Sequence, residues 1–122
     1  MIILMEALQN ILHTLGIGRR YKGYALLCYM IPLALEDDSR LYHMTQELFE
    51  PAAAHFHCDV SAVERNLRTV ILHAWRVNPD AIRSLVKYPL TQTPTVKEFI
   101  DILVSYLLRA AVSRSSRRPV SL

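Results

Sequence analysis

The chain has 122 residues, of which 52% are hydrophobic and only three are glycine, which excludes a disordered protein and fits one folded domain with its own core. Its formal net charge of +3 comes from the C-terminal end, because residues 109–122 hold four arginines and no acid. The rest of the chain carries ten bases and eleven acids, so net charge alone does not indicate a nucleic-acid partner.

The first two predicted helices come from apolar periodicity. Apolar residues recur at three- and four-residue spacing over 3–15, and Gly16 follows at once as a stop signal. The next segment, 21–35, has almost no polar face, which predicts a buried central helix that Pro32 can kink. Residues 36–39 then form a polar break whose last two members are good helix caps.

A third helical stretch is expected over residues 41–56, and it contains Pro51. Proline is tolerated in the first turn of a helix and disrupts later turns. The stretch is therefore expected either to bend at Glu50 or to split into two short helices. Residues 57–60 follow as a short turn.

The clearest helical pattern covers residues 61–76. After a break at Asn78 and Pro79, Asp80 is expected to cap a short helix over 81–87, and 89–94 form a loop.

The last helix is expected to begin at Thr95, because Glu98 three residues later completes a capping box. Its apolar stripe ends at Val112. The sequence thus predicts an all-α, compact five- to six-helix domain over residues 1–112, followed by a flexible basic tail over 113–122. That tail is either a sequence-independent phosphate clamp or merely solvated, and both interpretations stay open.

The helix over 61–76 is amphipathic, with a basic outer face. Projection at 100° per residue places one set of residues inward: Val63, Leu67, Val70, Ile71 and Ala74. The opposite side carries polar residues that we take as the candidate DNA-binding set: Ser61, Glu64, Arg65, Arg68, Thr69 and Arg76. Small residues at 52–54 allow a preceding short helix to cross this one closely, which is the packing that a helix-turn-helix needs.

These side chains suit the reading of bases. Arginine donates two parallel hydrogen bonds to guanine, and a carboxylate accepts from the amino group of cytosine. Arg65 and Arg68 are thus guanine or phosphate candidates, and Glu64 is a cytosine candidate. Two ordinary alternatives remain open at this point: Glu64 can close a capping box with Ser61, and Arg68 can pair with Glu64 on a solvated face.

The segment Ser61-Ala62-Val63-Glu64-Arg65-Asn66-Leu67-Arg68, with Ala74-Trp75 downstream, resembles the recognition helix of a known family. This is the C-terminal effector domain of the sporulation master response regulator of endospore-forming bacteria. Other pieces agree in order: Ile17-Gly18, Lys22-Gly23-Tyr24, 48–56 around Pro51, 82–88, Pro94-Thr95 and 98–100. The similarity spans nearly everything from the first predicted helix to the last.

The resemblance implies a six-helix, non-enzymatic domain that activates or represses transcription. It implies double-stranded DNA with a TGTCGAA-like core as the ligand, homodimers on tandem sites, and the RNA polymerase sigma subunit as a partner. By the same resemblance, Glu64, Arg65 and Arg68 match base- and backbone-contacting positions. No cofactor is implied, and the expected location is cytoplasmic.

The chain departs from the family in ways that bear on function. Ala62 stands where the family commonly has arginine, Thr69 where it has histidine, and Leu72 where it has glutamate. No phosphorylated receiver domain precedes the first helix, so the chain is either a fragment or a receiver-less relative, and Met1 slightly favours a natural start. The alternative function is a receiver-less protein-interaction module, one that binds a full-length regulator or RNA polymerase without efficient DNA reading.

Other classes of function have weaker support. Cys28 and Cys58 form neither a disulfide framework nor a zinc quartet. His55, His57 and Cys58 lack a fourth ligand at matching spacing, so no metal site is expected. No phosphate loop, nucleophile elbow or paired-carboxylate motif appears, and the longest apolar run is too short to span a bilayer as a helix.

Overall fold

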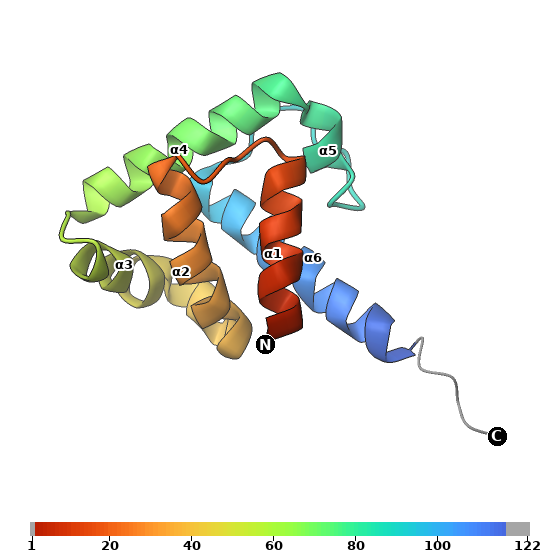
Figure 1. Ribbon diagram of the computed structural model, residues 1–122, viewed down its shortest axis with the longest axis horizontal. Helices are drawn as coiled ribbons and strands as arrows, with labels where there is room; N and C mark the ends of the chain where they lie inside the picture. Colours follow the sequence, from red (N-terminus) through yellow and green to blue (C-terminus); the bar gives the residue numbers. More distant parts are fainter. Residues whose placement is uncertain (1, 117–122) are drawn as a thin grey trace.

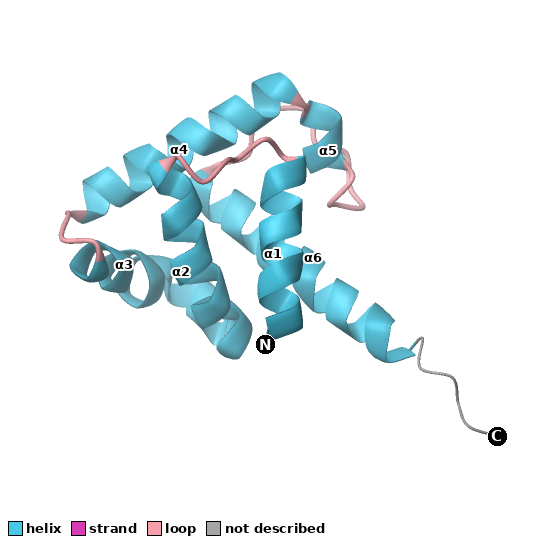
Figure 2. Cartoon of the chain, viewed as in Figure 1, coloured by secondary structure: helices cyan, strands magenta, loops and turns pink. Residues whose placement is uncertain are grey.

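The computed structural model describes residues 2–116, and this part of the chain is all-α with no strand (Figure 2). It contains six α-helices, which are α1 (Ile2–Thr14), α2 (Lys22–Glu36), α3 (Glu50–His55), α4 (Val60–Val77), α5 (Pro79–Arg83) and α6 (Val96–Ser116). A 3₁₀ helix (Asp38–His43) and a π-helical turn (Thr45–Phe49) connect α2 to α3. The predicted fold class is therefore confirmed.

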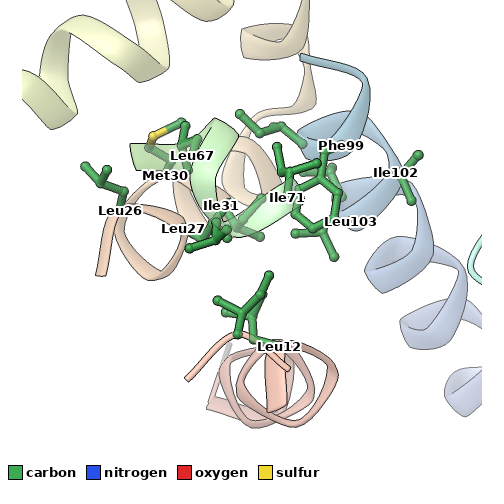
Figure 3. Packing of buried hydrophobic residues seen from close by; sticks show 14 of the residues in the cluster. Leu12, Leu26, Leu27, Met30, Ile31, Leu67, Ile71, Phe99, Ile102 and Leu103 are labelled. Atoms are coloured by element: carbon green, nitrogen blue, oxygen red, sulfur yellow. The ribbon is translucent and has the colours of Figure 1, made fainter. Parts of the chain in front are cut away.

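The helices are arranged around α2, which packs against α1, α3, α4 and α6. In Figure 1, α4 lies across the top of the molecule, and α1 and α2 run downward beneath it with α6 behind them. Figure 3 shows side chains of α2, α4 and α6 converging, with Leu12 of α1 facing them. Leu27, Leu67, Phe99 and Leu103 in this cluster are fully buried. One core thus holds all four long helices.

The α2 helix is central, but it is not buried on every side. Its buried residues lie toward the core, whereas Ala25 is exposed and Tyr29 is half-buried. Half-buried Cys28 lies on this outer side, and burial raises the pKa of its thiol. Because α2 has almost no polar residues, its sequence pattern did not indicate that one side faces solvent.

In the third helical stretch, a π-helical turn lies directly before the turn that contains Pro51. Because proline has no N–H and its ring crowds the carbonyl four residues earlier, a regular α-helix cannot run through it. The wider turn avoids this conflict: the N–H of Glu50 donates to the carbonyl of Thr45, five residues back. Pro51 then occupies the first turn of α3. The stretch is not split at Glu50: residues 44–55 stay helical, with the π-helical turn as the irregularity before Pro51, and Leu48 and Phe49 remain buried.

The structure differs from the predicted cap at Asp80 and from the alternative cap at Ser61. Asp59, not Ser61, is the N-cap of α4, and its carboxylate accepts from the N–H of Ala62 at 2.7 Å. Asn78, not Asp80, caps α5 through the N–H of Ala81. Each observed cap lies two residues earlier in the sequence, because α4 begins at Val60 and α5 at Pro79.

The capping box at the start of α6 is confirmed. The N–H of Glu98 donates to Oγ1 of Thr95 at 3.1 Å, and the N–H of Thr95 donates to Oε1 of Glu98 at 3.3 Å. At its other end α6 continues to Ser116, four residues beyond the expected domain boundary. The rest of the predicted tail, 117–122, lies outside the described residues. Among the described helices, none is long and apolar enough to cross a membrane.

Candidate nucleic-acid interface

The short helix α3 and the turn after it fix the start of α4. Ala52 and Ala53 are buried, so α3 and α4 approach each other with little side-chain bulk between them. The turn over 56–59 closes with the N–H of Cys58 donating to the carbonyl of Ala53 at 2.9 Å. His57 has a φ of 55°, the left-handed conformation that commonly ends a helix. The arrangement is a helix, a four-residue turn and a longer helix.

The two faces of α4 are those that the sequence predicts. The inner face is buried and consists of Val63, Leu67, Val70, Ile71 and Ala74. On the outer face, the exposed candidates are Ser61, Arg65, Arg68, Thr69 and Arg76, and Glu64 is half-buried. The structure therefore brings all six candidate residues onto the solvent side of one 18-residue helix.

The arginines of this face are free to bind a ligand. No ion pair within the described residues involves Arg65, Arg68 or Arg76, and the alternative pairing of Arg68 with Glu64 is not formed. The alternative capping box between Ser61 and Glu64 is also absent, because Asp59 caps the helix. The guanidinium groups thus keep their donors for a partner outside the domain.

Thr69 is a partial exception on this face. Its hydroxyl donates to the carbonyl of Arg65 at 2.9 Å, within the helix itself. The hydroxyl proton is therefore engaged, and only the oxygen lone pairs remain for an external donor. Thr69 is therefore a weaker donor to phosphate than Ser61 or the three arginines of this face.

A groove of about 680 Å³ runs along one edge of the outer face. Glu64, Arg68 and Leu72 line its α4 side, and residues 93–97 before and at the start of α6 line the other. Lys97 belongs to this second wall, so the groove carries a cation on each side. This edge of α4 is open to solvent and has a positive rim.

The opposite edge of α4 is braced by the start of α2, which the sequence pattern did not predict. A methyl group added at Gly23 would lie 2.8 Å or less from both γ-carbons of Val70 and 2.9 Å from the carbonyl oxygen of Asn66. The rings of Tyr21 and His73 lie 5.2 Å apart. Gly23 was the one sequence feature that could have indicated this contact, since a glycine inside a helix often marks a close approach of another segment.

The histidines and cysteines do not assemble into a metal site. No group of three potential ligands occurs among the described residues. His55 stacks on Tyr29 at 4.4 Å between ring centroids, and His73 lies against Tyr21 instead of facing the segment that holds Cys58. Both cysteines are free thiols.

Trp75 lies on the margin of the site. It is half-buried against the core, and the guanidinium carbon of Arg83 lies 5.0 Å from the centre of its ring. The ring therefore packs α4 against the α5 segment.

One comparison with known proteins identifies the domain. Residues 8–107 match the family model described as sporulation initiation factor Spo0A C terminal. The match begins within α1 and ends within α6, so it includes the whole of α4 and both segments that flank it. This family consists of DNA-binding domains and not of catalytic ones.

Proposed function

This chain belongs to the Spo0A C-terminal family of DNA-binding effector domains, and from that premise we propose that it reads a short TGTCGAA-like box of duplex DNA. In this proposal α3, the turn over 56–59 and α4 act as a helix-turn-helix, with α4 in the major groove. The observation that carries the proposal is the exposed outer face of α4 with its unpaired arginines.

The proposed roles follow from side-chain chemistry. Arg65 and Arg68 present two-pronged donors that fit the O6 and N7 atoms of guanine, and Glu64 accepts from the N4 amino group of cytosine. Arg65 and Arg76 are separated by eleven residues, which is about 16 Å along a helix, so Arg76 reaches a phosphate instead of the same bases. Ser61 and Thr69 complete the face as short-range polar contacts.

The departures from the family pattern are expected to alter affinity. Ala62 supplies no charge, and Leu72 places a partly exposed apolar side chain, 38% accessible, beside Arg68. An apolar group at that place can contact the methyl group of a thymine but cannot accept a hydrogen bond. We expect a shifted box preference and a smaller phosphate contribution than a domain with arginine at position 62 has.

The biological setting in this proposal is transcriptional regulation. The domain binds tandem boxes as a homodimer, contacts the sigma subunit of RNA polymerase, and needs no cofactor. Binding to the chromosome places it in the cytoplasm, at the nucleoid.

The test is a fluorescence-anisotropy titration of the full chain against a TGTCGAA-containing duplex and a scrambled duplex at two salt concentrations. We expect at least tenfold tighter binding to the box, since specific binding usually exceeds non-specific binding by far more than that. Equal affinity for both duplexes contradicts specific reading. Failure to bind either duplex, together with retention of a full-length regulator or RNA polymerase, supports the protein-interaction module instead.

A further inference from the structure

The segment between α1 and α2 carries a cluster of positive charge. Arg19, Arg20 and Lys22 are three cations within four residues, and all three are exposed. No aspartate or glutamate occurs between Glu6 and Glu36 in the sequence. None of the three cations takes part in an ion pair within residues 2–116. The cluster is thus uncompensated by the chain around it.

The fold holds this cluster against α4. Gly23 is buried against Val70 and the backbone carbonyl of Asn66, so the first turn of α2 touches the middle of α4. Figure 1 shows the connecting segment running from the top of α1 to the top of α2 close beneath α4. The backbone of the segment that carries the cations therefore lies beside α4, and the Arg19 guanidinium is also close enough to act on the Cys28 thiol of α2.

Aromatic contacts connect Arg20 of the cluster to the C-terminal half of α4. The guanidinium carbon of Arg20 lies 5.6 Å from the centre of the Tyr21 ring, and that ring lies 5.2 Å from His73. His73 is followed one turn later by Arg76, which is exposed and unpaired within the described residues. The ring of Tyr21 thus lies between Arg20 and the C-terminal half of α4, which carries Arg76.

The α4 helix itself adds no negative charge beside the cluster. Between Glu64 and Asp80 the sequence holds no acid, whereas Arg65, Arg68 and Arg76 all lie there. A positive edge without carboxylates attracts polyanions, and a duplex whose major groove receives a helix presents a phosphate strand on each side of that helix.

We propose that Arg19, Arg20 and Lys22 form a second DNA contact, which binds the phosphate strand beside the groove that α4 enters. This inference rests on the proposed function. The cluster lies at the edge of α4 and not on its outer face, so it reaches phosphates and not base edges. It therefore supplies affinity and orientation without sequence preference.

The test is the salt dependence of DNA binding by the double variant Arg19→Ala/Arg20→Ala in the full chain. Loss of two phosphate contacts should reduce the slope of log affinity against log salt concentration by about 1.8, which is roughly sixtyfold in affinity at 0.1 M salt as an upper bound. The loss should be the same for the TGTCGAA duplex and the scrambled duplex. Circular dichroism and a thermal melt verify the fold of each variant.

Two further variants serve as controls. Arg19→Lys/Arg20→Lys keeps both charges and should keep the wild-type slope. Lys87→Ala removes an exposed cation from the segment after α5, outside the cluster, and should leave the slope unchanged within about 0.3.

The outcomes separate this inference from the proposed function. An unchanged slope in the double alanine variant, with the wild type still preferring the box, refutes the second contact and leaves the reading by α4 intact. A loss confined to the TGTCGAA duplex also refutes it, because it indicates base reading by the cluster. A wild type that binds neither duplex overturns both proposals.

Discussion

The close crossing of α2 over α4 makes Gly23→Ala a sharp test of the fold. A β-carbon at this position meets Val70 at 2.7 and 2.8 Å and the backbone carbonyl oxygen of Asn66 at 2.9 Å. Val70 is itself buried, and a β-branched side chain in a helix has one strongly preferred rotamer, so neither neighbour can move aside cheaply. The two helices must separate by several tenths of an ångström.

The expected cost is the difference between two effects. Overpacking of a tight contact costs about 1–3 kcal/mol. Alanine gains roughly 0.5–1 kcal/mol over glycine inside a helix. The net expectation is a destabilisation of between about 0 and 2.5 kcal/mol, whose upper end is a large share of the stability of a domain of this size. DNA affinity should fall as well, because the edge of α4 and the cluster at Arg19 move apart.

The assay is urea unfolding followed by circular dichroism, with Gly18→Ala as the matched control. No atom lies within 4 Å of a β-carbon placed at Gly18, and its φ is not in the left-handed region, so alanine should be neutral or stabilise by up to about 1 kcal/mol. A Gly23→Ala variant more stable than the wild type by the roughly 0.5–1 kcal/mol that alanine gains inside a helix, with an unchanged slope of free energy against urea, refutes the close crossing.

Four further outcomes follow from the same contacts. If Arg68 contacts guanine, Arg68→Ala should weaken binding to the TGTCGAA duplex by about 1–3 kcal/mol and relax the preference at one base pair. An equal loss of affinity for the scrambled duplex indicates a phosphate contact instead. Trp75→Ala should lower the free energy of unfolding by about 3 kcal/mol, near the low end for a tryptophan because the ring is only half-buried. A variant with wild-type stability and lost DNA affinity would instead make Trp75 a DNA-contacting residue. Asp59→Ala should cost about 1 kcal/mol through loss of the α4 cap, measured by urea midpoint, whereas Ser61→Ala should not. Removal of residues 113–122 should leave the melting temperature within a few degrees of the wild type, since the side chain of Val112, just before the cut, is 68% exposed. A large drop in melting temperature shows that the removed residues join the core.

Apolar periodicity was sufficient to predict the fold class and the faces of α4. The hydrophobic side of that helix is determined by residues such as Leu67 and Ile71, whose spacing already selects one direction as inward. The candidate residues on the other side then had to be solvent-facing. The capping box of Thr95 and Glu98 was equally visible, because it depends on two residues three apart.

Features that depend on contacts between distant segments were not visible. Nothing near Gly23 in the sequence specifies that its partner is Val70, so the brace of α2 on α4, and the charge cluster that it positions, required the structure. The caps at Asp59 and Asn78 were missed for a local reason. The apolar Val60 was assigned to the turn before α4 although it is the first residue of that helix, and the run Asn78-Pro79-Asp80 offered two polar residues that could cap α5.

The central claim is that the outer face of α4 meets DNA, and an NMR titration of the ¹⁵N-labelled chain with the TGTCGAA duplex tests it most directly. We predict that the largest amide shift changes fall on residues 61–69, with smaller changes at 19–22 and at Arg76, and that the scrambled duplex perturbs 19–22 and Arg76 but not the amides of 61–69. Shift changes confined to the groove between the 3₁₀ helix and α6, with α4 unperturbed by either duplex, contradict the account.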